Sequence, residues 1–242
     1  MTKDILLDRI KRNNIKIYND SFLNRNNQIL ELLVSLNIDM LKTGIDIVNL
    51  YDDDLLVKEA INMLKNHSNL SVGRCLTNIN TINGGISITG AKILCESKEI
   101  FNASSACDVL CNKVAIDYNI ALDGAKLINL AKNWYNAYYA RYVFVNKATI
   151  ENGYSMIGAK IINDSDKEYK ALFNSVVLCS EYLIENRLVF SLIEDINLSN
   201  NWEAASEVVD KYLVKDNFKE DILYKDESYS LIVNSVIRKR VR

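Results

Sequence analysis

The stretch GGISITGAK (residues 84–92) decides how this chain is built, because its last three residues recur at a fixed interval. It is superficially similar to a phosphate-binding loop, GxxxxGK[ST], since Gly85 and Gly90 have the required spacing. Ala91 stands where the loop needs its lysine, and no serine or threonine follows Lys92. Gly-Ala-Lys returns at positions 124–126 and again at 158–160, which is a period of 34. We therefore interpret it as a helix-packing element of a repeat, and not as a nucleotide site.

The repeat becomes clear when the chain is written in blocks of one period that begin at Ile82, Ile116 and Ile150. Six columns are identical in these three blocks, which indicates a real internal repeat. The columns hold the opening isoleucine, the three residues of Gly-Ala-Lys, an alanine (Ala103, Ala137, Ala171) and a valine (Val109, Val143, Val177).

A fourth block starts at Ile184 and keeps the alanine column at Ala205, but Leu-Ile-Glu replaces Gly-Ala-Lys. It reads as a degenerate end repeat, and the register is lost upstream of residue 82. The predicted organisation is a helical N-terminal region (1–81), four repeats (82–217) and a C-terminal helical segment with a basic tail (218–242).

The period also predicts the conformation of each block. In one continuous α-helix, a period of 34 makes about nine turns plus roughly 160°, so equivalent residues would face opposite ways. Turn-forming residues interrupt each block twice, as at Asn152-Gly153 and Ser199-Asn200-Asn201. We expect a helix A of about 11 residues and a helix B of about 16. The predicted fold class is all-α, an α-solenoid-like array of antiparallel helical hairpins in which Gly-Ala lies where A and B cross.

The blocks resemble the tetratricopeptide repeat, a family of helical hairpins with the same period. The resemblance rests on the period, on a small residue in helix A, and on the apolar residue three positions later. Helix B contributes an alanine, which Trp134 and Trp202 precede by three positions in two of the blocks. The helix A residues are Ala91, Ala125 and Ala159, followed by Leu94, Ile128, Ile162 and Ile196.

The flanks are helical in pattern as well. Residues 21–44 are expected to form one helix, with Ser21 as its cap and Gly44 as its stop. Another helix is predicted over 52–64, and one or two more over 218–242. Only IKIY (15–18) alternates like a strand.

Composition limits the function classes. The chain has 242 residues, a formal charge of -2 and a pI near 5.6, which argues against a generally basic nucleic-acid surface. No apolar run reaches the roughly 18 residues that span a bilayer, so no membrane span is expected. The charged N-terminus and the odd count of 5 cysteines favour a cytoplasmic, reducing location.

Three candidate sites are better explained by structure. The triplet Asp52-Asp53-Asp54 could bind a metal, but acids at a helix N-terminus cap its N–H groups. His67, the only histidine, is expected to be a surface or capping residue. The thiols Cys107, Cys111 and Cys179 are expected to be small core residues. We predict no metal site and no cofactor.

The densest aromatic stretch is NWYNAYYARYVFV (133–145). Tyr135 shares a column with Phe101 and Tyr169 and is expected to pack between repeats. The predicted partner-binding residues lie further along this stretch and in the basic end IRKRVR (237–242). They are Tyr138, Tyr139, Arg141, Tyr142, Arg238, Lys239 and Arg240. Tyrosine and arginine suit a protein interface, and also the stacking of single-stranded bases.

No group of residues supplies a nucleophile with its base, so we expect the chain not to be an enzyme. The leading hypothesis is a helical-repeat scaffold for protein–protein interaction, with a protein, a peptide or a second copy of the chain as its partner. The alternative is a single-stranded nucleic-acid-binding or nucleocapsid-like helical protein, which would use the Tyr/Arg helix and the basic tail.

Overall fold

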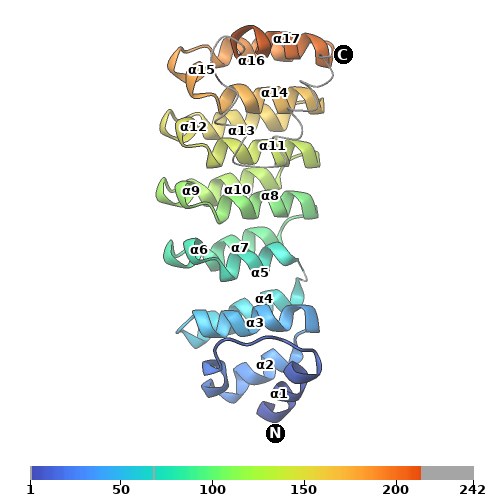
Figure 1. Cartoon of the computed structure of the whole chain (residues 1–242), viewed down its shortest axis with the longest axis vertical. Helices are drawn as coiled ribbons and strands as arrows, with labels where there is room; N and C mark the ends of the chain where they lie inside the picture. Colours follow the sequence, from blue (N-terminus) through green and yellow to red (C-terminus); the bar gives the residue numbers. More distant parts are fainter. Residues whose placement is uncertain (1, 68, 214–242) are drawn as a thin grey trace.

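The computed structural model of the chain describes residues 2–67 and 69–213. Within these ranges the chain forms 17 α-helices and one 3-10 helix and no β-strand, which confirms the all-α class. Figure 1 shows the helices stacked in one row, with α1 near one end and α17 at the other. No helix in the described ranges is both long and apolar enough to cross a membrane.

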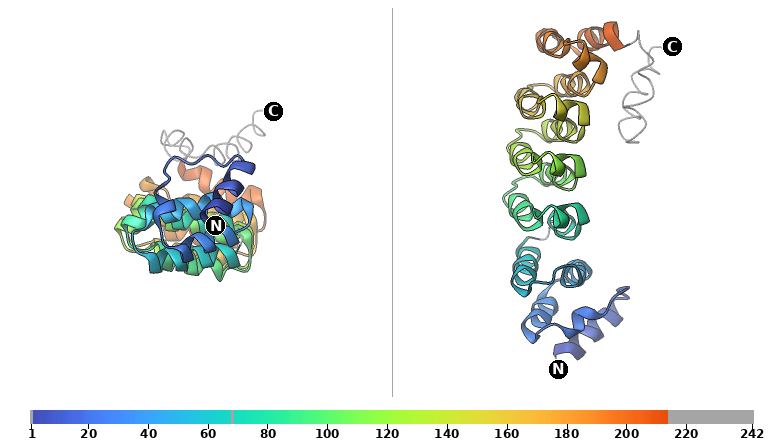
Figure 2. Two further views of the ribbon diagram at one scale, coloured as in Figure 1. Left: turned by 90° about the horizontal axis from the view of Figure 1, so that it is seen from below. Right: turned by 90° about the vertical axis from the view of Figure 1, so that its left-hand side faces the viewer.

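Helical hairpins form the row, and each hairpin contributes one helix to each of two layers. The right-hand view of Figure 2 looks nearly along the helix axes and shows the two layers side by side. The first layer contains α2 (Asn27–Ser35), α4 (Asp54–Asn66), α7 (Ser87–Cys95), α10 (Ala121–Asn129), α13 (Ser155–Asp164) and α16 (Val189–Leu198). The second layer contains α3 (Ile38–Leu50), α5 (Leu70–Thr77), α8 (Ile100–Leu110), α11 (Trp134–Val145), α14 (Glu168–Leu178) and α17 (Trp202–Leu213). Each hairpin packs on its neighbours, as α10 does on α7 and α8.

Short helices line one edge of the row, and they correct the predicted helix B of about 16 residues. They are α6 (Ile79–Asn83), α9 (Lys113–Asp117), α12 (Lys147–Glu151) and α15 (Glu181–Glu185), each one period after the last. Helix B is split because a side chain caps each short helix at its start. The Asn112 side chain accepts a hydrogen bond from the Ala115 N–H at 3.0 Å, and Asn146 accepts one from the Thr149 N–H at 2.9 Å.

The same spacing runs upstream of the expected repeat boundary. Asn78 caps α6 through the N–H groups of Asn80 and Thr81, as Asn112 caps α9. The boundary expected after residue 81 therefore falls inside α6, and the repeated architecture begins earlier in the chain than the identical columns indicate.

A left-handed residue follows every short helix. The backbone φ angle is positive at four positions that share one column of the repeat: Gly85 (66°), Asn119 (57°), Gly153 (72°) and Arg187 (57°). This conformation reverses the chain into the next first-layer helix, and glycine and asparagine adopt it most easily. Arg187 adopts the same backbone conformation, although its side chain makes that conformation unfavourable.

The recurring glycines lie at the contact between the two helices of a hairpin, as predicted. A Cβ atom on Gly124 would lie 2.9 Å from Cδ1 of Phe144, and one on Gly158 would lie 2.9 Å from Cδ2 of Leu178. Gly90 faces Leu110 in the same way, at 3.1 Å. The large residue of helix B thus fills the space that a side chain on helix A would need.

The N-terminal predictions need two corrections. Residues 21–44 do not form one helix but the 3-10 helix η1 (Ser21–Asn24), α2 and the start of α3, because Asn26 and Asn37 cap new helices. Gly44 does not stop a helix. It lies inside α3, where a Cβ atom would clash with the Leu36 side chain.

The prediction of a strand at residues 15–18 is wrong. The described ranges contain no strand, and an isolated strand has no partner for its backbone hydrogen bonds. Residues 15–18 belong to the loop between α1 (Thr2–Arg12) and η1. The helix predicted over 52–64 is confirmed as α4, shifted to Asp54–Asn66. The helices predicted over 218–242, with the basic residues Arg238, Lys239 and Arg240, lie outside the described residues.

Candidate partner-binding surfaces

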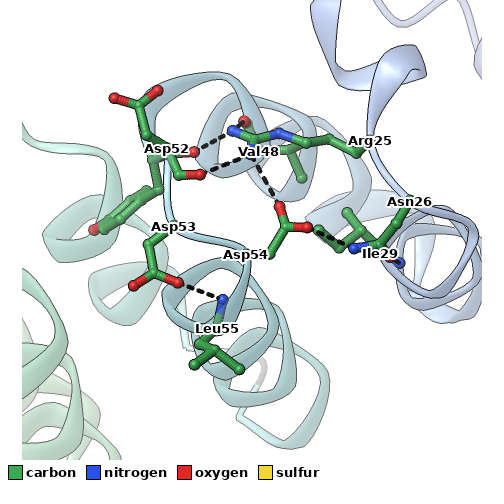
Figure 3. A network of polar contacts seen from close by, with 9 residues as sticks. Arg25, Asn26, Ile29, Val48, Asp52, Asp53, Asp54 and Leu55 are labelled. Atoms are coloured by element: carbon green, nitrogen blue, oxygen red, sulfur yellow. Dashed lines mark hydrogen bonds and ion pairs between the residues drawn. The ribbon is translucent and has the colours of Figure 1, made fainter.

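The acidic triplet before α4 is a helix cap that also ties two hairpins together (Figure 3). The Asp53 carboxylate accepts a hydrogen bond from the Leu55 N–H at 2.7 Å. Asp54 forms an ion pair with Arg25 at 2.9 Å and accepts a hydrogen bond from Asn26. Arg25 also donates to the Asp52 carbonyl at 2.9 Å, near the C-terminal end of α3. The Asp53 and Asp54 carboxylates therefore make structural contacts, as the capping interpretation predicts, and Asp52 takes part through its backbone carbonyl.

The thiols Cys107, Cys111 and Cys179 are buried, as expected of core residues. Cys107 and Cys111 have their sulfur atoms 3.8 Å apart, and the contact with Cys111 together with burial raises the pKa of Cys107. Burial raises the pKa of Cys179 to about 12. His67 is exposed and ends α4. In the described ranges no three His, Cys, Asp or Glu residues form a group that could hold a metal ion.

The predicted partner-binding residues of α11 divide into two sets. Tyr139 is only 3% exposed and belongs to the core, so its assignment to a binding surface is wrong. Burial raises its pKa. Tyr138, Arg141 and Tyr142 are partly exposed. Adjacent residues on a helix point about 100° apart, so Tyr139 can lie in the core while Tyr138 is partly exposed, although their ring centres are only 5.2 Å apart.

Arg141 joins a polar network that crosses three hairpins. The Asp108 carboxylate on α8 forms ion pairs with Arg141 on α11 and with Arg74 on α5, the latter at 2.6 Å. Asp108 is 25% exposed and Arg141 16%, while Arg74 is 55% exposed. The network therefore connects neighbouring repeats and leaves mainly Arg74 in contact with solvent.

Two tyrosines enclose the Arg141 guanidinium. Its central carbon lies 4.3 Å from the ring centre of Tyr138 and 4.8 Å from that of Tyr142, which places it in cation–π contact with both. Arg141 donates to the Tyr142 hydroxyl at 2.9 Å, and Tyr142 donates to the Tyr138 hydroxyl at 3.1 Å. Burial raises the pKa of Tyr142. Burial alone would lower the pKa of Arg141, but Tyr142 and Asp108 raise it, so the guanidinium stays charged.

Arg74 and Asp108 are functional candidates that the sequence reasoning missed. They share one column of the repeat with Tyr142, since each residue number exceeds the last by 34. The column carries a positive, a negative and a hydroxyl-bearing side chain, so identity between blocks could not reveal it. Complementary charge at one period was the available signal.

A second surface, also missed, is apolar. Four large apolar residues at the α7–α8 and α10–α11 turns are more than half exposed: Ile100 (75%), Phe101 (66%), Leu130 (77%) and Trp134 (51%). The ring centres of Phe101 and Trp134 are 6.4 Å apart, and Trp134 contacts Tyr135 edge-on at 6.0 Å. These turns lie on the edge of the row opposite the short helices (Figure 1). We call this set the apolar edge.

Tyr135 lies between the apolar edge and the core. It is partly buried against the core, and its hydroxyl lies 3.4 Å from the Asp166 carbonyl of the next hairpin. Tyr169 makes a similar contact one repeat later, with the Ser199 carbonyl at 3.0 Å. The prediction that this column packs between repeats is therefore confirmed for these two residues, whereas Phe101, which has no hydroxyl, is exposed.

A groove of about 400 Å³ lies between the loop before η1 and α3. Ile15, Ile17, Ile45 and Leu50 give it an apolar lining, and Lys42 at its rim pairs with Asp46 at 2.7 Å. A second polar pair in its lining is formed by the hydrogen bond from the Asn49 amide to the Asn19 carbonyl at 3.0 Å.

Comparison of the chain with protein-family models, with curated proteins and with solved structures found no match.

Proposed function

We propose that the chain is a non-catalytic helical-repeat protein that serves as a protein–protein interaction or self-assembly module. The observation that carries the proposal is the apolar edge, where Ile100, Phe101, Leu130 and Trp134 expose between 51% and 77% of their surface. Contiguous exposed apolar residues on a folded protein favour association. Aromatic residues such as Trp134 contribute strongly to protein interfaces.

The repeated architecture supports the same function. Stacked hairpins place their turns side by side, so residues far apart in sequence form one extended surface. The two turns of the apolar edge are one period apart in the sequence and adjacent in the row. The non-catalytic part of the proposal comes from the sequence, which offers a single histidine and no paired nucleophile and base. The resemblance to tetratricopeptide repeats, a family of interaction modules, remains a prediction that fits this proposal.

The nucleic-acid hypothesis is less well supported by the described residues. It would use Tyr138, Arg141 and Tyr142, but Arg141 already shares the Asp108 carboxylate with Arg74. A phosphate would have to compete with that carboxylate. We expect no binding of a labelled single-stranded RNA at low salt. Tight binding that weakens steeply with added salt would favour the nucleic-acid hypothesis instead.

The proposal is tested by affinity purification of the tagged full-length chain from its native cells, with quantitative mass spectrometry. The variant L130S/W134S alters the apolar edge. L198S is the matched control, because Leu198 is equivalent to Leu130 two repeats later and is 78% exposed. We expect a partner, or untagged copies of the chain, to be lost with L130S/W134S and retained with L198S. Equal recovery with both variants would contradict the proposed function.

A further inference from the structure

The occupant of the apolar edge can be inferred from the charges around it; this step rests on the proposed function. The rim carries two lysines, Lys98 and Lys132, and three acidic residues, Glu96, Glu99 and Asp164, all of them exposed. Lys132 reaches one carboxylate, that of Asp164 at 3.9 Å, with both side chains more than 70% exposed. In the described part of the chain, Lys98, Glu96 and Glu99 form no ion pair.

A rim that carries both charges disfavours a partner that is strongly charged. A strongly acidic or basic partner would bring like charges against at least two of the five rim residues, which is unfavourable. A second copy of the same surface does not have this problem. In a two-fold interface each contact from one residue to another is made twice, so every lysine can face a glutamate of the other copy.

The centre of the patch suits the same arrangement. Phe101 and Trp134 lie at neighbouring positions of adjacent hairpins, and both side chains are more than half exposed. Aromatic rings pack favourably edge to face, so two such pairs can interdigitate across a two-fold axis. Ile100 and Leu130 flank them and extend the apolar area.

We propose that two copies of this chain associate through the apolar edge, with Trp134 of each copy at the centre and the Lys98, Lys132, Glu96 and Glu99 side chains paired around it. The edge is formed by the α7–α8 and α10–α11 turns only. The α16–α17 turn, which carries Leu198, lies two hairpins away along the row and outside the interface.

Sedimentation equilibrium of the full-length chain measures the association directly. We expect a concentration-dependent dimer whose dissociation constant rises at least about tenfold in L130S and in W134S. The matched control L198S should dimerise like the wild type. Circular dichroism shows whether each variant retains its helices. A wild-type chain that stays monomeric, or a dimer that L130S and W134S leave unchanged, would overturn the inference.

Charge exchange separates self-association from binding through another surface. The variant K98E/K132E makes the rim acidic, and E96K/E99K makes it basic. Each variant alone should dimerise less tightly than the wild type, and an equimolar mixture should form a heterodimer that native mass spectrometry distinguishes by mass. Failure of the mixture to associate better than either variant alone would contradict a two-fold rim contact. If the chain is monomeric but captures another protein through Leu130 and Trp134, the proposed function stands and this inference fails.

Discussion

The hairpins α10–α11 and α16–α17 occupy equivalent places in the repeat, two periods apart, but a tryptophan at the same repeat position is exposed to different degrees in the two. Each begins its second helix with a tryptophan, Trp134 or Trp202. Trp202 is half-buried and packs against Phe173 at 5.1 Å and Tyr169 at 6.5 Å between ring centres. Trp134 is 51% exposed and is a main component of the apolar edge.

The preceding hairpin causes this difference. The residues that cover Trp202 are Tyr169 and Phe173, whose equivalents two repeats earlier are Phe101 and Ser105. Serine is too small to cover an indole ring, so Phe101 supplies the ring contact with Trp134 on this side. One repeat position can therefore serve the core or a surface, and a residue in the preceding hairpin decides which.

Removing the two tryptophans gives the strongest test of this comparison. W202A should lower the free energy of unfolding by about 3 kcal/mol, because it leaves a cavity between packed aromatic rings. W134A should change it by less than about 1 kcal/mol, as expected for a residue that is largely in solvent. Urea denaturation followed by far-ultraviolet circular dichroism measures both, at concentrations low enough to keep the chain monomeric. Equal losses for the two variants would show that the surroundings of the tryptophans do not differ.

The contact between the first and second helices also differs between the two hairpins, and a glycine substitution tests this difference. Gly124 of α10 faces the fully buried Phe144, whereas the equivalent residue of α16 is Leu192. G124A should destabilise the chain by about 1–2 kcal/mol. The destabilisation from overpacking against Phe144 exceeds the stabilisation from the higher helix propensity of alanine. The double variant G124A/F144L should recover part of the loss, because leucine occupies this position opposite Gly90 and Gly158. Additive losses in the double-mutant cycle would contradict the contact.

The polar network distinguishes the two hairpins on their second-layer face. Asp108 and Arg141 beside α10–α11 have Val176 and Val209 as their equivalents beside α16–α17. D108N should cost about 1 kcal/mol, because the carboxylate shared by Arg74 and Arg141 is lost from a partly buried site. The loss should be smaller when Arg74 is already alanine. An identical loss in both backgrounds, measured by urea denaturation, would show that Arg74 and Asp108 are not coupled.

Much of the fold could be predicted from the sequence because it depends on repeated local contacts. Gly90, Gly124 and Gly158 each face a large apolar residue of the same hairpin, so identical columns reflect similar surroundings. The split of helix B escaped prediction because its signal is a cap and not an apolar residue. The capping column holds Asn112 and Asn146 and then Ser180, so it is not identical among the blocks.

The candidate surfaces were harder to predict. In α11, apolar and aromatic residues occur on every side, so the pattern could not show that Tyr139 is buried while Tyr138 is partly exposed. The exposure of Trp134 depends on Ser105, which lies in another hairpin. Such long-range contacts leave no periodic trace in a single sequence.

The turns that lead into the two hairpins give the smallest expected effect. Asn119 precedes α10 and Arg187 precedes α16, and both have a φ angle of 57°. Asparagine tolerates this left-handed conformation, whereas most other side chains make it unfavourable by roughly 1–2 kcal/mol. Arg187 is exposed, so replacing it removes little packing.

R187G should raise the free energy of unfolding by up to about 1 kcal/mol, since relief of strain exceeds the added entropy of the unfolded chain. N119G should leave stability unchanged or slightly lower it. Thermal and urea denaturation of both variants check this pair, and a destabilised R187G would show that the arginine side chain makes a contact that outweighs its backbone strain.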